Sequence, residues 1–422
     1  MTTDCRVLVL DGFWNKALAA VRALGRRGLF VGAGDHRRLA PALWSRYCRR
    51  RFVHPSPARH PAAFLAALER ELAGGRYDVV LPMELHTQLL LAEERLRLAP
   101  HARLPFADAA ATRRVDDKAF VAGFAAAHGI ECPETRVPDG PEHLAAAARG
   151  LRYPVLVKPR HSSGGRGIRR VERGADLPEA YAAVHTRHPW PLLQECLPPG
   201  GDALGVAVLL DFASTPRASF AYRRLREYPV GGGPSTLRES IAGPGLRQAA
   251  ERLLSLLGWV GVAMVEFKVD PRDGHPKLLE VNPRFWGSLH HAILCGVDFP
   301  YLLCRLAMDG RIGPVPEYRV GVQSRNLLHG EFCHLLTSRN PGHPIPRLGA
   351  FGIPDDVLSA EDPWPVAARI ASVATALWDP DLRALLRHSA PEAERSAGTT
   401  GSAGATPSTY GTADRTTVGA DG

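Results

Sequence analysis

MVEFKVDPRDGHPKLLEVNPR, residues 264–284, predicts a β-hairpin and is the stretch that decides the fold. Short apolar runs flank a turn rich in proline, aspartate and glycine. A three-residue loop, 272–274, can join the two strands with Pro271 facing His275. Gly274 then occupies the left-handed position that loops of this length favour. This turn sets the pairing of the residues along both strands.

Two carboxylates and an amide come together on one face of the predicted hairpin. The register places Glu266 opposite Glu280, and Asn282, two residues further, points to the same face. Facing glutamates repel each other unless a cation lies between them. Oxygen ligands of this kind suit Mg²⁺ and leave coordination positions for phosphate oxygens. The alternative is a solvent-exposed polar face without function, and Arg284, a cation beside the cluster, argues against it.

VLVKPRHSSGGRGIRRV, residues 155–171, places Lys158 at the end of a strand and a glycine-rich loop after it. Backbone N–H groups of such a loop can turn onto an anion, because glycine tolerates the φ values required and lets the main chain approach a polyphosphate. The segment lacks the P-loop motif, and a second strand follows it instead of a helix. A glycine-rich hairpin turn without a ligand is the alternative interpretation.

Charged residues give a net charge of +9, from 52 Lys+Arg and 43 Asp+Glu, which permits attraction to nucleic acid, phosphates or acidic ligands. The arginines are scattered and are not interleaved with an aromatic platform, so we expect no nucleic-acid partner. Because arginine serves wherever a positive charge is enough, each retained lysine is a candidate for a site that needs a compact ammonium group. The lysines are Lys16, Lys118, Lys158, Lys268 and Lys277.

Length and composition predict two or three domains, since 422 residues with 45% hydrophobic content can fill more than one core. No run approaches the roughly 20 apolar residues of a membrane span. The first residues, MTTDCRVLVL, enter a strand-like segment without the pattern of a signal peptide, so we expect no membrane partner and a cytoplasmic location. Seven cysteines without a C-x-x-C pair disfavour a disulfide framework and a zinc knuckle.

Patterning outside the hairpin predicts the remaining organisation. Strand, helix and strand alternate in residues 1–105, which indicates a parallel α/β domain, although its first turn at 11–15 has no dinucleotide fingerprint. A helix is predicted from Asp116, as its N-cap, to about Gly129, and an antiparallel α+β region follows. The tail 396–422 is too poor in large apolar residues to form a core and is expected to be disordered.

Five features together resemble the ATP-grasp superfamily, of the carboxylate–amine ligase type with a carbamoyl-phosphate-synthase-like ATP-binding domain. They are Lys118, Lys158 with its SSGGRG loop, QEC at 194–196, Glu266 and LLEVNPR at 278–284, in the order and approximate spacing of that superfamily. The resemblance covers roughly residues 1–300. The ordered combination is far more specific than any single piece.

The resemblance implies the fold class α/β plus α+β. A Rossmann-like parallel sheet domain at 1–105 would precede a two-lobed ATP-grasp domain at 106–310. Its small lobe would span about 130–195 and its large lobe about 196–310, with ATP between them. We expect a mostly helical extension at 311–390, to which the sequence assigns no chemistry.

Site residues are implied by the resemblance in the same way. The ATP-binding set comprises Lys118 and Lys158 at the phosphates, Ser162, Ser163, Gly164, Gly165 and Gly167 over them, Glu195, Cys196 and Leu197 as the adenine hinge, and Asp202 as a ribose or acceptor contact. The Mg²⁺ ligands would be Glu266, Glu280 and Asn282, with Arg284 beside the transferred phosphoryl group. We expect two Mg²⁺ ions, with Mn²⁺ as a substitute.

GGGPSTLRESI, residues 231–241, resembles a segment of some uncharacterised ATP-grasp proteins in which an arginine and an acid enter the substrate cleft. Arg238 could therefore clamp a substrate carboxylate with two hydrogen bonds. A flexible loop with a surface Arg–Glu pair is the alternative. His290 and His291 follow the hairpin, but nothing in the ATP-grasp pattern requires them as metal ligands.

The expected reaction is ATP-dependent activation of a carboxylate as an acyl phosphate, followed by attack of an amine to form an amide or peptide bond. Lys158, Arg238 and Arg284 are the candidate catalytic residues. Two alternatives are a bicarbonate-activating enzyme of the carboxylase or carbamoyl-phosphate type and a non-catalytic nucleotide-binding protein. The partners would be small-molecule carboxylates and amines, and a homodimer is the oligomer that occurs most often.

Overall fold

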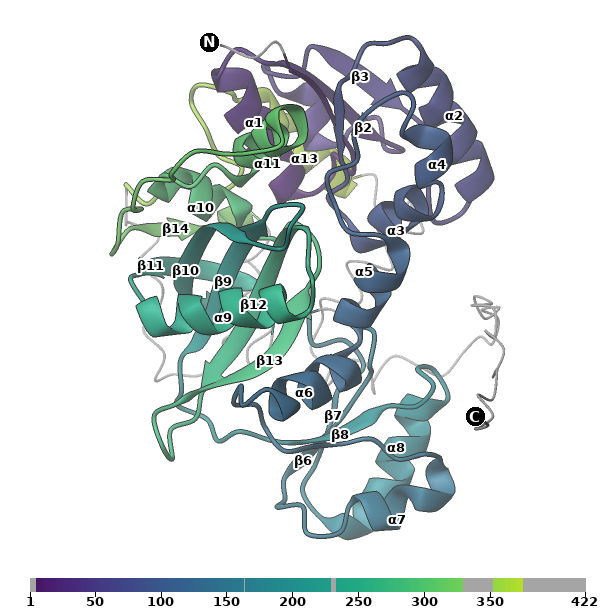
Figure 1. The fold of residues 1–422 in the computed structure, drawn as a ribbon, viewed down its shortest axis with the longest axis vertical. Coiled ribbons are helices and arrows are strands. Elements are labelled where there is room, and N and C mark those ends of the chain that lie inside the picture. Colours follow the sequence, from purple (N-terminus) through teal and green to yellow (C-terminus); the bar gives the residue numbers. More distant parts are fainter. Residues whose placement is uncertain (1–4, 163, 229–232, 329–351, 375–422) are drawn as a thin grey trace, which may run out of the picture.

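The computed structural model describes residues 5–162, 164–228, 233–328 and 352–374. Figure 1 shows an N-terminal sheet at the top, a large sheet in the middle and a small sheet at the bottom. The first sheet is parallel and the other two are antiparallel, so the fold class is the predicted α/β plus α+β. The predicted tail, 396–422, lies outside the described residues.

The N-terminal sheet has the strand order β3-β2-β1-β4. Both faces of β1 are buried, because Val7 and Val9 share a core with α1 whereas Leu8 and Leu10 share a core with α2. The elements of this unit are β1 (Arg6–Val9), α1 (Asn15–Arg26), β2 (Phe30–Asp35), η1 (Pro41–Trp44), β3 (Arg50–Val53), α2 (Pro61–Ala73), β4 (Val79–Leu81), α3 (Leu85–Glu93) and α4 (Arg95–Leu98).

Two helices, α5 (Ala109–Asp116) and α6 (Lys118–Ala127), lead from this unit to the small sheet. The predicted N-cap at Asp116 is wrong by one residue, because Asp116 is the last residue of α5. Asp117 has an extended conformation, and its carboxylate accepts hydrogen bonds from two backbone N–H groups of the next turn. The break makes Lys118 the first residue of α6.

The small sheet has the order β5-β8-β6-β7 and packs against helix α8. Val155 and Val157 of β6 share an apolar core with Tyr181 of α8. The hairpin of β6 and β7 contains the glycine-rich loop. The elements are β5 (Thr135–Arg136), η2 (Pro141–His143), α7 (Leu144–Ala147), β6 (Val155–Lys158), β7 (Arg169–Val171), η3 (Gly174–Asp176), α8 (Leu177–His185) and β8 (Leu192–Glu195).

The large sheet has the order β13-β12-β9-β10-β11-β14. Alternate residues of β9 face two different cores: Val206 and Val208 pack with α9 and α6, whereas Ala207 and Leu209 pack with α1, α10 and α11. The elements are β9 (Ala203–Leu210), β10 (Pro216–Glu227), β11 (Ser235–Ile241), α9 (Pro244–Leu256), β12 (Gly261–Val269), β13 (Pro276–Asn282), α10 (Leu289–Cys295), α11 (Phe299–Asp309) and β14 (Gln323–Arg325).

The hairpin of β12 and β13 has the predicted glutamate pair but a different turn. Glu266 faces Glu280, which confirms that part of the register. The backbone N–H of Asp270 donates to the carbonyl oxygen of His275 at 2.9 Å, so His275 does not face Pro271 and the predicted three-residue loop is wrong. A shift of one residue directly after Glu266 compensates, because a bulge absorbs the difference. The loop glycine has the predicted left-handed conformation, with a φ of +75°.

The described C-terminal residues add β14, which pairs with β11, and α13 (Trp364–Ala374), which lies against η1. β14 forms one edge of the large sheet. Among the described helices, none is by itself long and apolar enough to span a membrane. The consecutive helices α10 and α11 reach that length and composition only as a pair, with a bend of 85° between them.

Candidate functional site

Two carboxylates and one amide meet on one face of the large sheet, at the end of the hairpin away from its turn. Asn282 Nδ2 donates to Glu266 Oε1 at 3.0 Å and lies 3.5 Å from Glu280 Oε1. The side chains of Glu266 and Glu280 are 16% and 15% exposed. The structure therefore brings together the three residues that the sequence suggested as metal ligands, and their role as ligands stays a prediction.

Both predicted phosphate-binding lysines lie close to this cluster. Lys118 Nζ is 3.3 Å from Glu280 Oε2 and also donates to the carbonyl oxygen of Ser162. Lys158 Nζ is 3.5 Å from Gln194 Oε1 of β8. Each lysine is 6% exposed. The first turn of α6, the end of β6 and the hairpin thus contribute to one buried charged region.

Charge balance in this region shows in the direction of the pKa shifts. Burial alone would raise the pKa of Glu280, but the charges of Lys118 and Lys158 outweigh it and hold the pKa below its ordinary value. Burial lowers the pKa of Lys158, against the opposing charge of Glu280. The Glu280 carboxylate is therefore kept ionised, which is the form that binds a divalent cation.

Arg224 supplies a second cation that the sequence did not indicate. Glu266, Gly205 and Tyr222 are aligned across β12, β9 and β10, and Arg224 follows Tyr222 by two residues on the same face. Its Nη2 forms an ion pair with Glu266 Oε2. Each of the two facing glutamates is therefore paired with a cation, Glu280 with Lys118 and Glu266 with Arg224. These cations offset the repulsion between the two carboxylates. Finding Arg224 needs the strand order, which no local motif gives.

The glycine-rich loop joins β6 to β7 and lies beside the lysines through the contact of Lys118 with Ser162. A Cβ atom at Gly167 would come within 3.0 Å of Pro159 Cγ and 3.1 Å of His188 Nε2, so this position has room for glycine alone. Predicted Ser163 lies outside the described residues. The loop glycines with left-handed φ are Gly164 (65°), Gly165 (71°) and Gly167 (76°).

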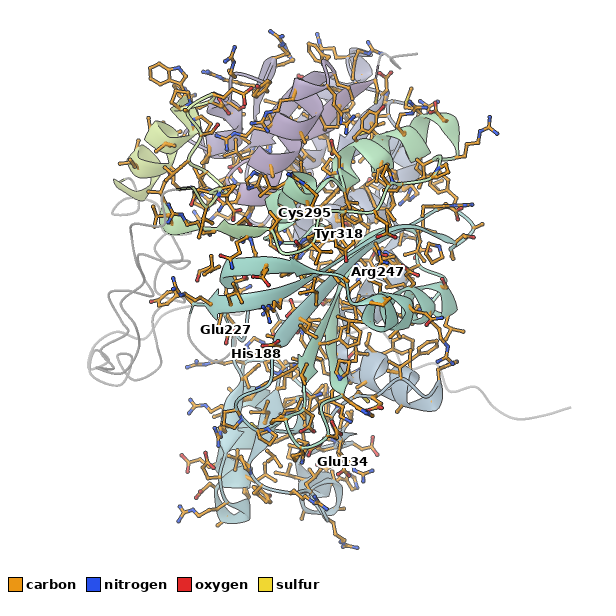
Figure 2. All side chains as sticks on the ribbon, turned by 90° about the vertical axis from the view of Figure 1, so that its left-hand side faces the viewer. Glu134, His188, Glu227, Arg247, Cys295 and Tyr318 are labelled. Atoms are coloured by element: carbon orange, nitrogen blue, oxygen red, sulfur yellow. The ribbon has the colours of Figure 1, made fainter. Side chains whose placement is uncertain are left out.

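The junction between the small lobe and the large sheet carries the residues predicted to hold the adenosine. Figure 2 labels His188 in the small lobe and Glu227 near the end of β10, on the two sides of this junction. Predicted hinge residues Glu195, Cys196 and Leu197 stand at and just after the end of β8. Arg272 Nη1 of the hairpin loop lies 2.7 Å from Glu195 Oε1. Asp202 is more exposed, and its Oδ2 is 3.8 Å from Arg223 Nη1.

The N-terminal unit forms a wall beside Arg284. Arg284 donates to Asn282 Oδ1 at 3.1 Å and to the carbonyl oxygen of Phe285 at 2.9 Å. Lys16 of α1 donates to the same carbonyl oxygen at 3.1 Å and lies 2.6 Å from the carboxylate of Glu84. Burial, and then the charge of Arg284, lowers the pKa of Lys16 to about 8, although the charge of Glu84 acts in the opposite direction. Sequence reasoning missed Lys16 and Glu84 as neighbours of the site.

Arg238 has a carboxylate partner from within the chain. Its side chain is 1% exposed, its guanidinium pairs with Asp356, and its Nε donates to Ser324 Oγ at 2.9 Å. His290 Nδ1 lies 3.4 Å from Asp356 Oδ1. The interior position differs from that of a surface Arg–Glu pair, and binding of a substrate carboxylate by Arg238 stays a prediction.

Comparison with known proteins places these features in a wider group. Residues 216–328 match a family model described as ATP-grasp in the biosynthetic pathway with Ter operon. Acetyl-CoA carboxylase of Saccharomyces cerevisiae is 27% identical over 219 residues, which cover 49% of this chain and 10% of that protein. The chain therefore corresponds to about a tenth of the length of this relative.

Solved structures share the fold at low sequence identity. Biotin carboxylase from Campylobacter jejuni, solved as a β,γ-ATP complex, has a TM-score of 0.64 and 16% identity, and the match covers 75% of this chain and 74% of that one. N5-carboxyaminoimidazole synthetase from Staphylococcus aureus, complexed with ADP, has a TM-score of 0.60 and 15% identity, with 78% and 83% covered. Both matches cover about three quarters of this chain, and at this level of identity they show the fold alone.

Proposed function

We propose that this chain, which belongs to the ATP-grasp superfamily, is an ATP-dependent, Mg²⁺-requiring ligase that activates a carboxylate as an acyl phosphate and joins it to an amine. The observation that carries the proposal is the contact of Lys118 with Glu280, 3.3 Å long, at the Glu266–Glu280–Asn282 cluster. This contact brings a candidate phosphate-binding lysine and the candidate metal ligands together from separate elements. Such a combination suits a nucleotide polyphosphate with its metal.

The donor atoms fit Mg²⁺. Glu266 and Glu280 present carboxylate oxygens, the hard ligands that Mg²⁺ prefers, and Glu280 is kept ionised. Asn282 directs its Nδ2 to Glu266 and its Oδ1 to Arg284, so its side-chain amide would turn over to offer its oxygen to the metal. In the absence of metal, Lys118 neutralises the charge of Glu280 and Arg224 that of Glu266. Both ion pairs have to break for the glutamates to bind a metal ion. Bound Mg²⁺ would neutralise charge on the phosphoryl oxygens. Mn²⁺ is expected to substitute for it.

Other residues of the chain would bind and orient the reactants. Lys118 and Lys158 would hold ATP phosphates, with the 162–167 loop over them, and Glu195 to Leu197 would contact adenine. A substrate carboxylate oxygen would then attack the γ-phosphorus, releasing ADP and leaving an acyl phosphate. Arg284 would stabilise the charge on the phosphoryl group during this transfer. Attack of the amine on the acyl carbon would form the amide bond, with release of phosphate and a proton.

Bicarbonate activation is the second candidate function. It is favoured by the carboxylase names of the relatives, which include acetyl-CoA carboxylase and biotin carboxylase. In that reaction the bicarbonate oxygen attacks the γ-phosphorus, and carboxyphosphate forms in place of the acyl phosphate. The same metal and lysine cluster serves both reactions, so the substrate distinguishes them.

The test measures phosphate release from ATP with panels of carboxylates and amines, and separately with bicarbonate. A ligase releases phosphate when a particular carboxylate and amine are added together, and ¹⁸O from that carboxylate appears in the phosphate. Dependence on bicarbonate with no response to other carboxylates would favour the second function. Failure of ADP and ATP to bind in the presence of Mg²⁺ would contradict both functions.

Assembly and location extend the proposal. The partners are expected to be small-molecule carboxylates and amines, with no nucleic acid and no membrane. A homodimer in the cytoplasm is the expected state. Sedimentation of the purified protein with and without RNA tests both the oligomer and the missing nucleic-acid affinity.

A further inference from the structure

Arg224 is a buried cation on the face of the proposed metal site. Its side chain is 11% exposed, and Nη2 forms an ion pair with Glu266 Oε2. Nη1 donates to the carbonyl oxygen of Gly233 at 3.3 Å. Its Nε is buried and has no hydrogen-bond partner among the described residues. The charge of Glu227 also acts on Arg224, but the carboxylate that pairs directly with the guanidinium is Glu266, one of the proposed metal ligands.

Two other arginines near the site keep a partner that Mg²⁺ would not take away, whereas Lys118 is paired with Glu280, which is itself a proposed metal ligand. Arg238, directly opposite Arg224 on β11, is paired with Asp356, which lies outside the candidate metal cluster. Arg284 is held in part by the carbonyl oxygen of Phe285. Arg224 differs, because coordination of a metal by Glu266 competes directly with its ion pair.

We propose that the Arg224 guanidinium occupies the Glu266 carboxylate until Mg²⁺ binds there, and that Mg²⁺ then releases it to bind an oxyanion of the reactants. The inference rests on the proposed function, since it takes Glu266 as a metal ligand. The oxyanion is either the transferring phosphoryl group or the carboxylate that attacks it, because both present the paired oxygens that a guanidinium binds.

This exchange couples the binding of Mg²⁺ at Glu266 to the binding of the oxyanion at Arg224. A guanidinium so little exposed is costly without a counter-charge, so loss of Glu266 creates a demand for another anion. Mg²⁺ and the oxyanion should therefore each strengthen the binding of the other. The substrate carboxylate would consequently bind well only after the metal nucleotide, which gives an ordered reaction.

The first experiment measures orthophosphate binding to the metal-free protein by calorimetry. Glu266→Gln should tighten phosphate binding about tenfold, equal to about 1.4 kcal/mol, because Arg224 is then released without metal. The double variant Glu266→Gln/Arg224→Gln should return to the affinity of the parent protein. Equal gains in the single and double variants would overturn the inference, since the gain would then be a general charge effect.

Glu280→Gln is the matched control, because it removes the same charge from the facing position, whose cation is Lys118. Any gain in phosphate affinity that it causes should persist when Arg224→Gln is added. Thermal midpoints check that each variant folds. Arg224→Lys, which keeps the charge, serves if the glutamine variant does not fold, and it should retain part of the coupling.

The second experiment titrates Mg²⁺ into the ADP complex. Arg224→Gln should lower the Mg²⁺ concentration for half-saturation several-fold, because the competing cation is gone. Arg217→Gln, which removes the same charge from the other end of β10, where Arg217 pairs with Asp211 at 2.7 Å, should leave that concentration unchanged. Equal shifts in both variants, or none in either, would contradict the competition.

Two further arms identify the oxyanion. If Arg224 binds the phosphoryl group, Arg224→Gln should weaken a non-hydrolysable ATP analogue with Mg²⁺ more than it weakens MgADP. If Arg224 binds the carboxylate, Arg224→Gln should change the affinities of the two nucleotides by the same factor, and orthophosphate binding to the analogue complex should be lost. Normal MgADP binding, with no change in the relative nucleotide affinities and no loss of orthophosphate binding in Arg224→Gln, would reject this inference and leave the proposed function standing.

Discussion

At the scale of single residues, the site depends on compact and planar cations that are not interchangeable. Lys118 and Lys158 are buried; Lys118 contacts oxygens of Glu280 and Ser162, and Lys158 lies 3.5 Å from Gln194 Oε1. An ammonium group can turn toward phosphate oxygens from such a position, whereas the wider guanidinium fork cannot be placed there without moving its neighbours. This explains why lysine persists here in a chain that otherwise uses arginine.

Lys118→Ala and Lys158→Ala are each expected to weaken ATP binding severely while the protein still folds. Lys158→Arg should fail as well, for the geometric reason above. Calorimetry with ADP and ATP measures the affinity, and circular dichroism checks the fold. Lys268→Ala, a lysine on β12 outside the contacts of the cluster, serves as the control; near-parental nucleotide affinity in the Lys118 and Lys158 variants would contradict their assignment.

Variants of the metal cluster should separate metal binding from phosphoryl transfer. Glu280→Gln should abolish turnover, and Asn282→Ala should raise the Mg²⁺ concentration for half-maximal turnover. Arg284→Ala should lower turnover at unchanged metal dependence, since its charge acts on the phosphoryl group. Because Glu280 balances the buried Lys118, its loss should also cost stability, on the order of 1–3 kcal/mol. A Mg²⁺ titration of ATP turnover tests the set, and normal turnover of Glu280→Gln would refute the metal site.

At the scale of elements, the glycine-rich loop combines two different constraints. All three described loop glycines have left-handed φ, which costs a side-chain-bearing residue about 1 kcal/mol. Gly167 is in addition enclosed by Pro159 and His188, whereas a Cβ at Gly164 would meet nothing within 4 Å. The two positions therefore separate backbone strain from steric fit.

Gly167→Ala is expected to weaken nucleotide binding more than Gly164→Ala does, because it both strains the backbone and pushes the loop away from its neighbours. Both variants should keep the parental thermal midpoint within a few degrees, since the change is confined to a loop. Calorimetry with MgADP gives the comparison. Equal affinities of the two variants would show that the enclosure of Gly167 has no part in binding.

At the scale of the whole molecule, the C-terminal segment 352–374 contacts both the N-terminal unit and the large sheet. Arg22 of α1 forms a buried ion pair with Asp362 at 2.9 Å and donates to the carbonyl oxygen of Val357. The same segment carries Asp356, the partner of Arg238 on the large sheet. This connection holds the wall formed by Lys16 and Glu84 at a fixed place beside Arg284.

Arg22→Ala should destabilise the protein by about 3–5 kcal/mol, because it leaves the buried Asp362 carboxylate without its counter-charge. Arg26→Ala is the matched control on the same helix. Its partner Glu361 is next to Asp362 in sequence, but the pair is exposed, so the cost should be below about 1 kcal/mol. Denaturant unfolding measures both, and similar losses would contradict the role of the buried pair.

Lys16 should make the stability depend on pH in the alkaline range. Its pKa is lowered to about 8 in the folded protein from 10.5 for the free group. The unfolded chain therefore binds more protons between those values, so stability should rise with pH through this window relative to Lys16→Met, which lacks the group. Below pH 8 the difference between the two proteins should be constant. If the free energies of unfolding of the parent protein and Lys16→Met change in parallel between pH 8 and 10.5, the pKa of Lys16 is not lowered in the folded protein.

Local sequence determined the parts of this protein that depend on neighbouring residues. The hairpin, the glycine-rich loop and the early α/β unit follow from periodicity and turn residues. The facing of Glu266 and Glu280 was predicted correctly from a wrong turn, because a one-residue bulge cancels the error. The resemblance of five ordered motifs extended this to the superfamily. The turn itself was misjudged by one residue, because a bulge is a local irregularity that adds no motif to the sequence.

Tertiary structure alone decided which charges meet. Arg224 reaches Glu266 because β9 lies between their strands, and Asp356 reaches Arg238 from a segment more than a hundred positions later. The same holds for Lys16 beside Arg284. Strand order and domain packing come from the burial of many apolar side chains at once, which no short motif encodes. Electrostatic partners follow from that packing, and the sequence therefore predicted the candidate ligands of the site but not which cations pair with them.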